Sequence, residues 1–104
     1  MADLLPLSVR SSIASYSCED EGFALHVAEG DDERIFRARV HFTVAFAVTP
    51  VVHVGLAGFD IDRDDTARLH VHAEAITTGG FDVVLTTWRR TRVYGATVSW
   101  LAIG

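Results

Sequence analysis

The chain has 104 residues and a mass of 11.4 kDa, enough for one hydrophobic core and too little for two. Hydrophobic residues make up 49% and charged residues 22%, a balance that predicts a packed globular domain and excludes intrinsic disorder. The formal net charge is −5, and all nine basic residues are arginine. Because no global positive field attracts phosphate groups and no stretch reaches the length of a membrane span, we expect neither nucleic-acid binding nor membrane insertion.

The N-terminal residues 1–6 and the single cysteine bear on the cellular compartment. Cys18 has no partner for an internal disulfide, so the fold is expected to depend on its core alone. Residues 1–6 lack a basic segment, and Pro6 and Ser8 interrupt the apolar run. The sequence therefore predicts synthesis in the cytoplasm without a signal peptide.

Alternation of polar and apolar residues recurs along the chain and predicts strands. Residues 4–17 give no clear prediction, and no segment shows the periodicity of a helix. Gly79 and Gly80 predict a tight turn between two strands, so residues 68–88 should form a β-hairpin. The expected strands are 23–27, 40–46, 51–56, the two arms of 68–88, and 93–103, with acidic loops at 29–33 and 60–65. This pattern predicts an all-β sandwich or small barrel.

Two histidines and a glutamate lie on one face of the expected strand that begins the hairpin. His70, His72 and Glu74 alternate with apolar residues, so the three side chains should project together. Structural zinc prefers ligands from separate elements that close a tetrahedron. The more economical interpretation is a solvated strand face, and we expect no metal ligand here.

The acidic loop resembles the beginning of a calcium loop but lacks two of its defining positions. Asp60, Asp62 and Asp64 have the right spacing, whereas Asp65 replaces the glycine and Val71 replaces the final glutamate. An EF-hand is therefore excluded. A solvated acidic loop is the expected structure, with a looser calcium site as the alternative.

No motif of an enzyme is present in the sequence. The serines lie outside any Gly-x-Ser-x-Gly motif, and no glycine-rich phosphate loop occurs. A small sandwich also offers little concavity in which to bury a catalytic triad. The sequence thus predicts no catalytic residue, no cofactor and no enzymatic activity.

Aromatic and arginine side chains cluster between the last two expected strands, over residues 88–94. Trp88 and Tyr94 offer flat apolar faces, and Arg89, Arg90 and Arg92 offer directed hydrogen-bond donors. Such a turn suits a sugar ring, whose C–H face matches an aromatic ring and whose hydroxyls match guanidinium groups. Alternatively, the rings complete the core and the arginines pair with the acidic loops.

The last two thirds of the chain resemble the H-type lectin family, which includes the snail agglutinins and the C-terminal domain of the discoidins. No single motif is diagnostic, but the order and spacing of six short segments make the resemblance specific. Residues 1–35 match the family poorly. The segments are Thr49–Val52, Gly58–Asp62, Thr77–Phe81, Thr87–Trp88, Thr91–Tyr94 and Val98–Ile103.

The resemblance implies a six-stranded antiparallel sandwich that assembles as a homotrimer, with sites for galactose-type sugars, notably N-acetylgalactosamine, between subunits. It implies neither catalysis nor a metal in the sugar contact. By position, Arg68 aligns with an arginine that hydrogen-bonds the sugar, and Trp88 and Tyr94 align with aromatic contacts. Arg89 stands where a snail agglutinin has histidine, a change that favours acidic or differently linked sugars. The remaining predicted sugar contacts are Asp31 or Asp32, with Gly30 alongside.

A lectin binds glycans outside the cell. We therefore expect this protein to leave the cell by an unconventional route or as part of a released phage-like particle. In that view residues 1–30 form an N-terminal segment with a docking or oligomer role, and residues 31–104 form the lectin-like domain. The alternative function is a structural spike or receptor-attachment component that binds a host polysaccharide or protein. Stacking of two trimers into a hexamer stays open.

Overall fold

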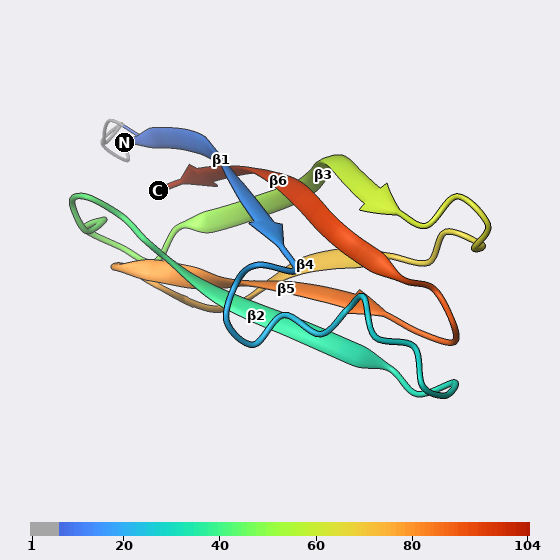
Figure 1. The fold of residues 1–104 in the computed structure, drawn as a ribbon. Coiled ribbons are helices and arrows are strands. Elements are labelled where there is room, and N and C mark those ends of the chain that lie inside the picture. The colour runs from blue at the N-terminus through green and yellow to red at the C-terminus, as the bar shows by residue number, and fades with distance from the viewer. Residues whose placement is uncertain (1–6) are drawn as a thin grey trace.

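The computed structural model describes residues 7–104, which form two three-stranded antiparallel sheets packed face to face (Figure 1). One sheet has the order β1-β6-β3 and the other β2-β5-β4. This confirms the predicted all-β, six-stranded antiparallel sandwich. The strands are β1 (Val9–Ser17), β2 (Arg34–His41), β3 (Val51–Ile61), β4 (His70–Thr77), β5 (Gly80–Thr87) and β6 (Val93–Ile103).

The strand β6 is the centre of the first sheet and pairs with β1 and β3 on either side. Its last residue, Ile103, lies opposite both Val9 and Val51. The pairing with β1 is regular to Ser17, whereas β3 has an irregularity between Leu56 and Gly58. A bulge of this kind bends an edge strand and increases its twist.

The predicted hairpin is confirmed and forms β4 and β5 of the second sheet. Thr77 lies opposite Gly80 at its turn. A Cβ atom at Gly80 would lie 2.2 Å from the carbonyl oxygen of Val40 in β2, so the close approach of these strands requires glycine. His70 and His72 lie opposite Thr86 and Val84 of β5, on the outer face of the sheet.

The expected strand over residues 40–46 is wrong, because β2 ends at His41. The backbone N–H groups of Phe42 and Phe46 donate hydrogen bonds to the carbonyls of Gly79 and Thr78 in the hairpin turn, at 2.9 and 2.8 Å. Both phenyl rings are buried in this irregular segment, whereas Val44 is 66% exposed. The alternation of apolar and polar residues over 40–46 therefore arises because the rings of Phe42 and Phe46 are buried, and it does not indicate a strand.

The expected strand over residues 23–27 is also wrong, since this stretch lies in turns of the long loop between β1 and β2. Leu25 is fully buried, and its carbonyl oxygen accepts a hydrogen bond from the backbone N–H of Val93 at 2.9 Å. The apolar residues of this segment close one end of the core without pairing as a strand.

The strand β1 lies in a region where the alternation of residues makes no clear prediction. Its own pattern places Val9 and Ile13 on the outer face, where they are 62% and 64% exposed. The apolar pattern is thus opposite to that of a half-buried strand, which explains why residues 9–17 are not recognisable as one. Residues 9–17 of the expected N-terminal segment are part of the sandwich, and residues 1–6 lie outside the described residues.

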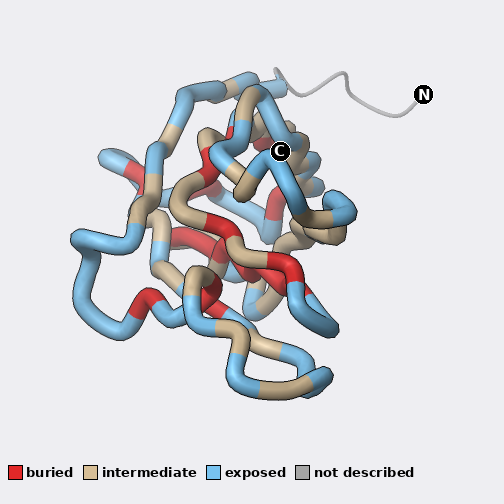
Figure 2. The backbone as a smooth tube through the Cα atoms, turned by 45° about the vertical axis from the view of Figure 1, so that its right-hand side comes forward, coloured by how far each residue is buried: buried red, intermediate tan, exposed pale blue. Residues whose placement is uncertain are grey.

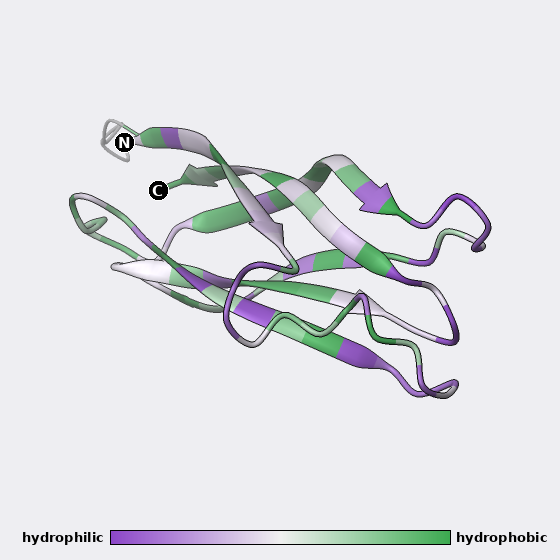
Figure 3. Cartoon of the chain, in the orientation of Figure 1, coloured by the Kyte–Doolittle hydropathy of each residue, from purple (hydrophilic) through white to green (hydrophobic). Residues whose placement is uncertain are grey.

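The core lies between the two sheets, and its buried residues run through the middle of both layers (Figure 2). Residues 7–104 contain no helix with the length and hydropathy of a membrane span. The beginning of β1 and the end of β6 lie at one end of the sandwich, and the loops that follow β1, β3 and β5 reach the other end, where much of each loop is hydrophilic (Figures 1 and 3). These loops contain all the predicted sugar contacts except Tyr94, which lies in β6. The largest fully buried side chains are Phe81, Leu25, Leu85, Val83, Val84, Val93 and Val98.

Candidate functional site

Three loops meet at the polar end of the sandwich: residues 18–33 after β1, residues 62–69 after β3, and residues 88–92 between β5 and β6. The backbone N–H of Arg89 donates to the carbonyl of Asp31 at 3.2 Å, and that of Asp62 donates to the carbonyl of Arg92 at 3.0 Å. The loop 88–92 thus contacts both of the others and lies between them.

Arg34, the first residue of β2, fastens the loop 18–33 to the loop 88–92. Its guanidinium donates to the carbonyls of Leu25 at 3.0 Å, Arg89 at 2.7 Å and Thr91 at 2.8 Å, and also to that of Val27. Burial lowers the pKa of Arg34 below its ordinary value. A planar group with several fixed donors is well suited to such carbonyls, so Arg34 positions both loops.

Arg92 fastens the acidic loop to the same turn. Its Nε and Nη2 atoms donate to the two carboxylate oxygens of Asp65, each at 3.1 Å, and its backbone N–H donates to Asp65 at 2.8 Å. Asp62 lies 3.4 Å from Nη2. Hydrogen bonds from Arg92 hold the pKa of Asp65 below its ordinary value, and Arg68 lowers it further. Arg92 is therefore paired with carboxylates of the acidic loop and stabilises the fold at this end.

We expect Asp65→Asn to lower the free energy of unfolding at pH 7. The free energy of unfolding of this variant should also fall less than that of the wild type when the pH is lowered. A carboxylate whose pKa is lower in the folded state contributes stability that is present above its unfolded pKa and lost as the pH falls through the folded value. The measurement is the urea midpoint at pH 7 and at about pH 3, below the ordinary aspartate pKa of about 3.9. The difference in urea midpoint between the variant and the wild type should be smaller at about pH 3 than at pH 7. Replacement of the exposed Asp64 by asparagine serves as the control. An equal difference in urea midpoint between Asp65→Asn and the wild type at both pH values would contradict the stabilising role of the Asp65 carboxylate.

Arg68 lies two residues before β4, rather than within the strand that the sequence predicts from residue 68. Its Nη1 donates to the hydroxyl oxygen of Thr91 at 3.0 Å, and the Thr91 hydroxyl donates to the carbonyl of Thr66 at 2.6 Å. The hydroxyl of Thr87 donates to the carbonyl of Arg68. The buried Thr87 and Thr91 thus hold Arg68 beside the loop 88–92. The Arg68 side chain is half-buried, and its guanidinium has further N–H donors.

Trp88 and two arginines form the exposed rim of the site. The indole of Trp88 is 36% exposed at the end of β5. Arg89 has a φ of 57°, in the left-handed region, which turns the chain back toward β6. Nε of Arg90 lies 3.7 Å from the carboxylate of Asp31, and both side chains are largely exposed. Such an exposed pair holds its partners weakly, so these groups are free to meet a ligand.

Tyr94 and Gly30 also lie at this end of the molecule. The ring of Tyr94 is half-buried, and its centroid lies 6.3 Å from that of His26. Gly30 and Asp32 line a hollow of about 430 Å³ beside Arg34. The structure therefore brings Asp31 to Arg89 and Arg90, whereas Asp32 faces this separate hollow.

All seven predicted residues lie at one end of the sandwich, but the structure links them through residues that the sequence does not single out. Arg34 and His26 are site residues that sequence reasoning missed, and the sequence indicates Asp65 only as part of an acidic loop. The position of Arg34 directly after the acidic loop is the one available signal, and it does not identify the carbonyls that Arg34 binds. The predicted residues are Gly30, Asp31, Asp32, Arg68, Trp88, Arg89 and Tyr94.

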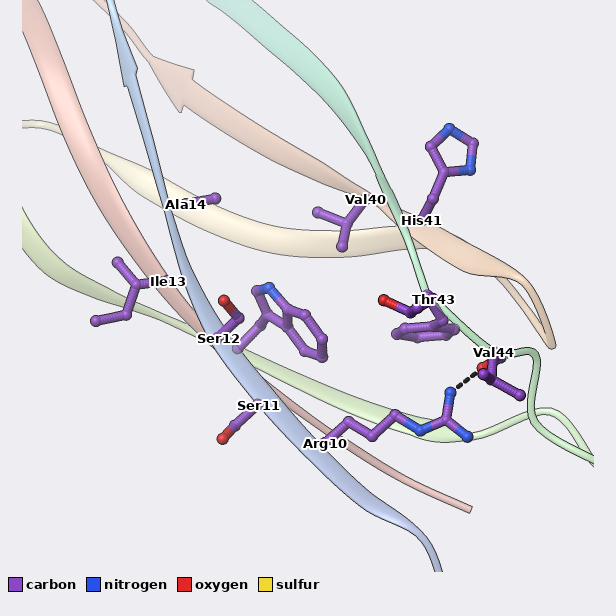
Figure 4. Close-up of a pocket in the computed structure, with 11 residues that line it drawn as sticks. Arg10, Ser11, Ser12, Ile13, Ala14, Val40, His41, Thr43 and Val44 are labelled. Carbon is purple, nitrogen blue, oxygen red and sulfur yellow. Dashed lines mark hydrogen bonds between the residues drawn. The ribbon is translucent and has the colours of Figure 1, made fainter.

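Another hollow lies between β1 and residues 40–44 and has a volume of about 750 Å³ (Figure 4). Arg10 extends across it and donates to the carbonyl of Val44. The guanidinium carbon of Arg10 also lies 4.0 Å from the centre of the Phe46 ring. None of the seven predicted residues lines this hollow, so it is separate from the loop end.

The outer face of β2-β5-β4 is charged, and its groups are paired with one another. Arg37 lies 2.7 Å from Glu74, and His72 also contacts Glu74. Hydrogen bonds from Arg37 and then His72 hold the pKa of Glu74 below its ordinary value. Within residues 7–104, no group of three or more His, Cys, Asp and Glu side chains is placed to hold a metal ion.

The sequence model of the H-type lectin domain matches residues 37–103. The chain belongs to the H-type lectin family. The match includes Arg68, Trp88, Arg89 and Tyr94 and begins after Gly30, Asp31 and Asp32. The resemblance stated from the sequence is thereby confirmed.

Relatives of this H-type lectin support the assignment. A protein of Fuscovulum blasticum called ATP synthase subunits region ORF 7 is 41% identical over 75 residues, covering 72% of this chain and 65% of that protein. Discoidin-2 of Dictyostelium discoideum is 33% identical over 75 residues, covering 71% of this chain and 29% of discoidin-2. The chain thus spans less than two thirds of the length of either relative.

Solved structures of discoidin II from Dictyostelium discoideum have the same fold. The wild-type structure aligns with a TM-score of 0.81 at 29% identity, covering 95% of this chain and 37% of discoidin II. A native structure of the recombinant protein gives 0.79 at 30% identity, covering 93% and 36%. The structural likeness therefore includes β1 and the loop 18–33, beyond the residues that the family model matches.

Proposed function

We propose that this H-type lectin binds cell-surface carbohydrate, without catalysis, at the loop end of its sandwich. The observation that carries the proposal is an exposed indole, Trp88, on the same short loop as Arg89 and Arg90, with the carboxylate of Asp31 3.7 Å from Nε of Arg90 and the loops fixed by Arg34. Membership of a lectin family supports it. Preorganised loops bind a weakly held ligand at lower entropic cost than mobile ones.

The proposed ligand is a galactose-type sugar, with N-acetylgalactosamine as the first candidate. The indole of Trp88 would pack on the apolar face of the ring, and Arg68 and Asp31 would donate to and accept from its hydroxyls. Arg89 and Arg90 add positive charge at the rim. An acidic substituent on the sugar would therefore strengthen binding, and this chemistry is the alternative specificity.

The proposed assembly is a homotrimer in which neighbouring subunits complete each site, with a hexamer as a further possibility. Single shallow sites bind weakly, and several sites on one particle multiply the strength of attachment to a glycan-rich surface. Sedimentation velocity should show a species of three times the chain mass at micromolar concentration. A stable single chain at that concentration would contradict the trimer. We further propose action outside the cell, after unconventional release or on a phage-like particle.

A glycan array with the wild type and Trp88→Ala tests the binding proposal. The wild type should bind galactose- or N-acetylgalactosamine-terminated glycans, and the variant should bind them about fivefold more weakly, because removing an aromatic contact costs about 1 kcal/mol. Val48→Ala is the matched control, since Val48 is 62% exposed in the loop after β2. Binding by the variant equal to that of the wild type would contradict the site, as would silence of the wild type toward all sugars.

A further inference from the structure

Three neighbouring side chains lie on the outer face of β2-β5-β4, in the row next to the loop end. Thr86 of β5 is opposite Ile35 of β2 on one side and opposite His70 of β4 on the other. Phe36, which follows Ile35, is buried in the core, whereas Ile35 is exposed. Because side chains alternate across a strand, the three side chains project together from the outer face. We call Ile35, Thr86 and His70 the Thr86 shelf.

The shelf adjoins the proposed carbohydrate site. Trp88 follows Thr86 by two positions, and Arg68 precedes His70 by two. Residues two apart on a strand lie on the same face, about 6.6 Å from each other. The hydroxyl of Thr87 donates to the carbonyl of Arg68, so the chain segments of β4 and β5 stay side by side beyond their last paired residues. A ligand held by Trp88 and Arg68 is therefore next to the shelf.

The chemistry of the shelf suits a neutral, amphipathic ligand. The Ile35 side chain is 49% exposed and offers alkyl surface. His70 is exposed, and its ring centroid lies 5.9 Å from that of His72. Within the described residues, neither the imidazole of His70 nor the hydroxyl of Thr86 forms a side-chain hydrogen bond or ion pair. Each of these two groups can donate and accept hydrogen bonds.

Ion pairs limit the shelf on the side away from the loops. In the next rows, Arg37 lies 2.7 Å from Glu74 and Arg39 lies 3.2 Å from Asp82. Glu74 also contacts His72. A ligand over these rows would have to displace charges that are already paired. The open part of this face is therefore one row deep, which suits a single sugar residue.

We propose that the Thr86 shelf is a subsite for the second residue of a glycan whose first residue is held at the loop end. The second residue is a neutral N-acetylhexosamine. Its acetamido methyl group packs on Ile35, and its amide and hydroxyl groups exchange hydrogen bonds with Thr86 and His70. The inference rests on the proposed function, since the loops must hold the first residue, and it adds a preference for disaccharides over monosaccharides.

The test is a two-dimensional ¹⁵N NMR titration of the whole chain with methyl N-acetylgalactosaminide and with a panel of disaccharides. In the panel, N-acetylgalactosamine is α- or β-linked to each hydroxyl of N-acetylglucosamine or of galactose. The methyl glycoside should shift amides at residues 88–92, and the preferred disaccharide should also shift those of Ile35, Thr86 and His70.

The affinities from the same titrations measure the contribution of the shelf. At least one N-acetylglucosamine disaccharide should bind about tenfold more tightly than the methyl glycoside, the effect expected for one buried methyl group and one hydrogen bond. Its galactose counterpart, which lacks the acetamido group, should gain less. An equal gain for the galactose counterpart would overturn the assignment to an N-acetylhexosamine. Disaccharides that all bind no more tightly than the methyl glycoside would overturn the subsite.

Two variants separate the shelf from the loops. Ile35→Ala removes the alkyl surface and His70→Ala removes the imidazole; each should weaken disaccharide binding about threefold or more and leave the affinity for the methyl glycoside unchanged. His41→Ala is the matched control, because His41 is exposed on the outer face at the far end of β2 and should affect neither ligand. Unchanged disaccharide binding in both variants would overturn the proposal, as would an equal loss for both ligands.

The outcomes distinguish this inference from the proposed function. Binding of the methyl glycoside at residues 88–92 with no gain for any disaccharide would overturn the shelf and leave the loop site standing. Shifts at the shelf without shifts at residues 88–92 would contradict both the loop site and the role of the shelf as its second subsite. Binding of neither kind of ligand would overturn both.

Discussion

Replacing Arg34 with alanine is expected to lower the free energy of unfolding by about 3 kcal/mol or more and to abolish carbohydrate binding at the loop end. Hydrogen bonds from a charged donor contribute about 1.5–3 kcal/mol each, and their loss is not additive. Arg34 makes four, to carbonyls in two loops. Without it the carbonyls of both loops lose their donor, and the loop 18–33 is no longer fixed to 88–92.

Urea denaturation and the glycan array measure these two effects. Arg34→Lys keeps the charge but replaces the planar fork with a single ammonium group, so it should restore only part of the stability and little of the binding. Arg37→Ala is the control on the same strand, because the Arg37 side chain is 48% exposed and lies on the outer face. Full glycan binding by Arg34→Ala would show that the loops hold their positions without Arg34.

Replacing Phe81 with alanine should lower the free energy of unfolding by about 3–5 kcal/mol, the usual cost of removing a buried phenyl ring. Phe81 of β5 is fully buried. Its ring centroid lies 5.5 Å from that of Trp100 in β6 and 5.9 Å from that of Phe42. The ring thus joins the two sheets to the segment that closes the core after β2, and a cavity there weakens all three contacts.

Thermal and urea unfolding of Phe81→Ala provide the measurement. A domain of this size has a total stability of about 5–15 kcal/mol, so the variant should stay folded at low temperature with a strongly reduced midpoint. Ile13→Ala is the control, since Ile13 is 64% exposed on the outer face of β1, and it should change the midpoint little. A similar loss in both variants would mean that the core is not where the structure places it.

The hairpin and the last strand were predictable because their signals are local. Leu69, Val71 and Ala73 alternate with polar residues, and Gly79 and Gly80 provide the turn. The signals failed where tertiary contacts decide the structure. Phe42 and Phe46 alternate like strand residues, yet their backbone groups bond to the hairpin turn instead of a neighbouring strand.

The candidate site was only partly predictable, for a related physical reason. Trp88, Arg89 and Tyr94 are close in sequence, so their clustering is visible in the order of residues alone. Arg34 acts on Thr91, which lies 57 positions further along the chain. It acts through backbone carbonyls, which every residue possesses, and such partners leave no mark in the sequence.

The central claim is that a saccharide packs on Trp88 at the loop end. Trp100 is the second tryptophan of the chain, so the Trp100→Phe variant leaves Trp88 as the single indole fluorophore. Titration of this variant with N-acetylgalactosamine should give a saturable change in fluorescence, with a midpoint between micromolar and millimolar, and added free ligand should stabilise the fold. Saturable binding of the same sugar by calorimetry with no change in Trp88 fluorescence would contradict the claim.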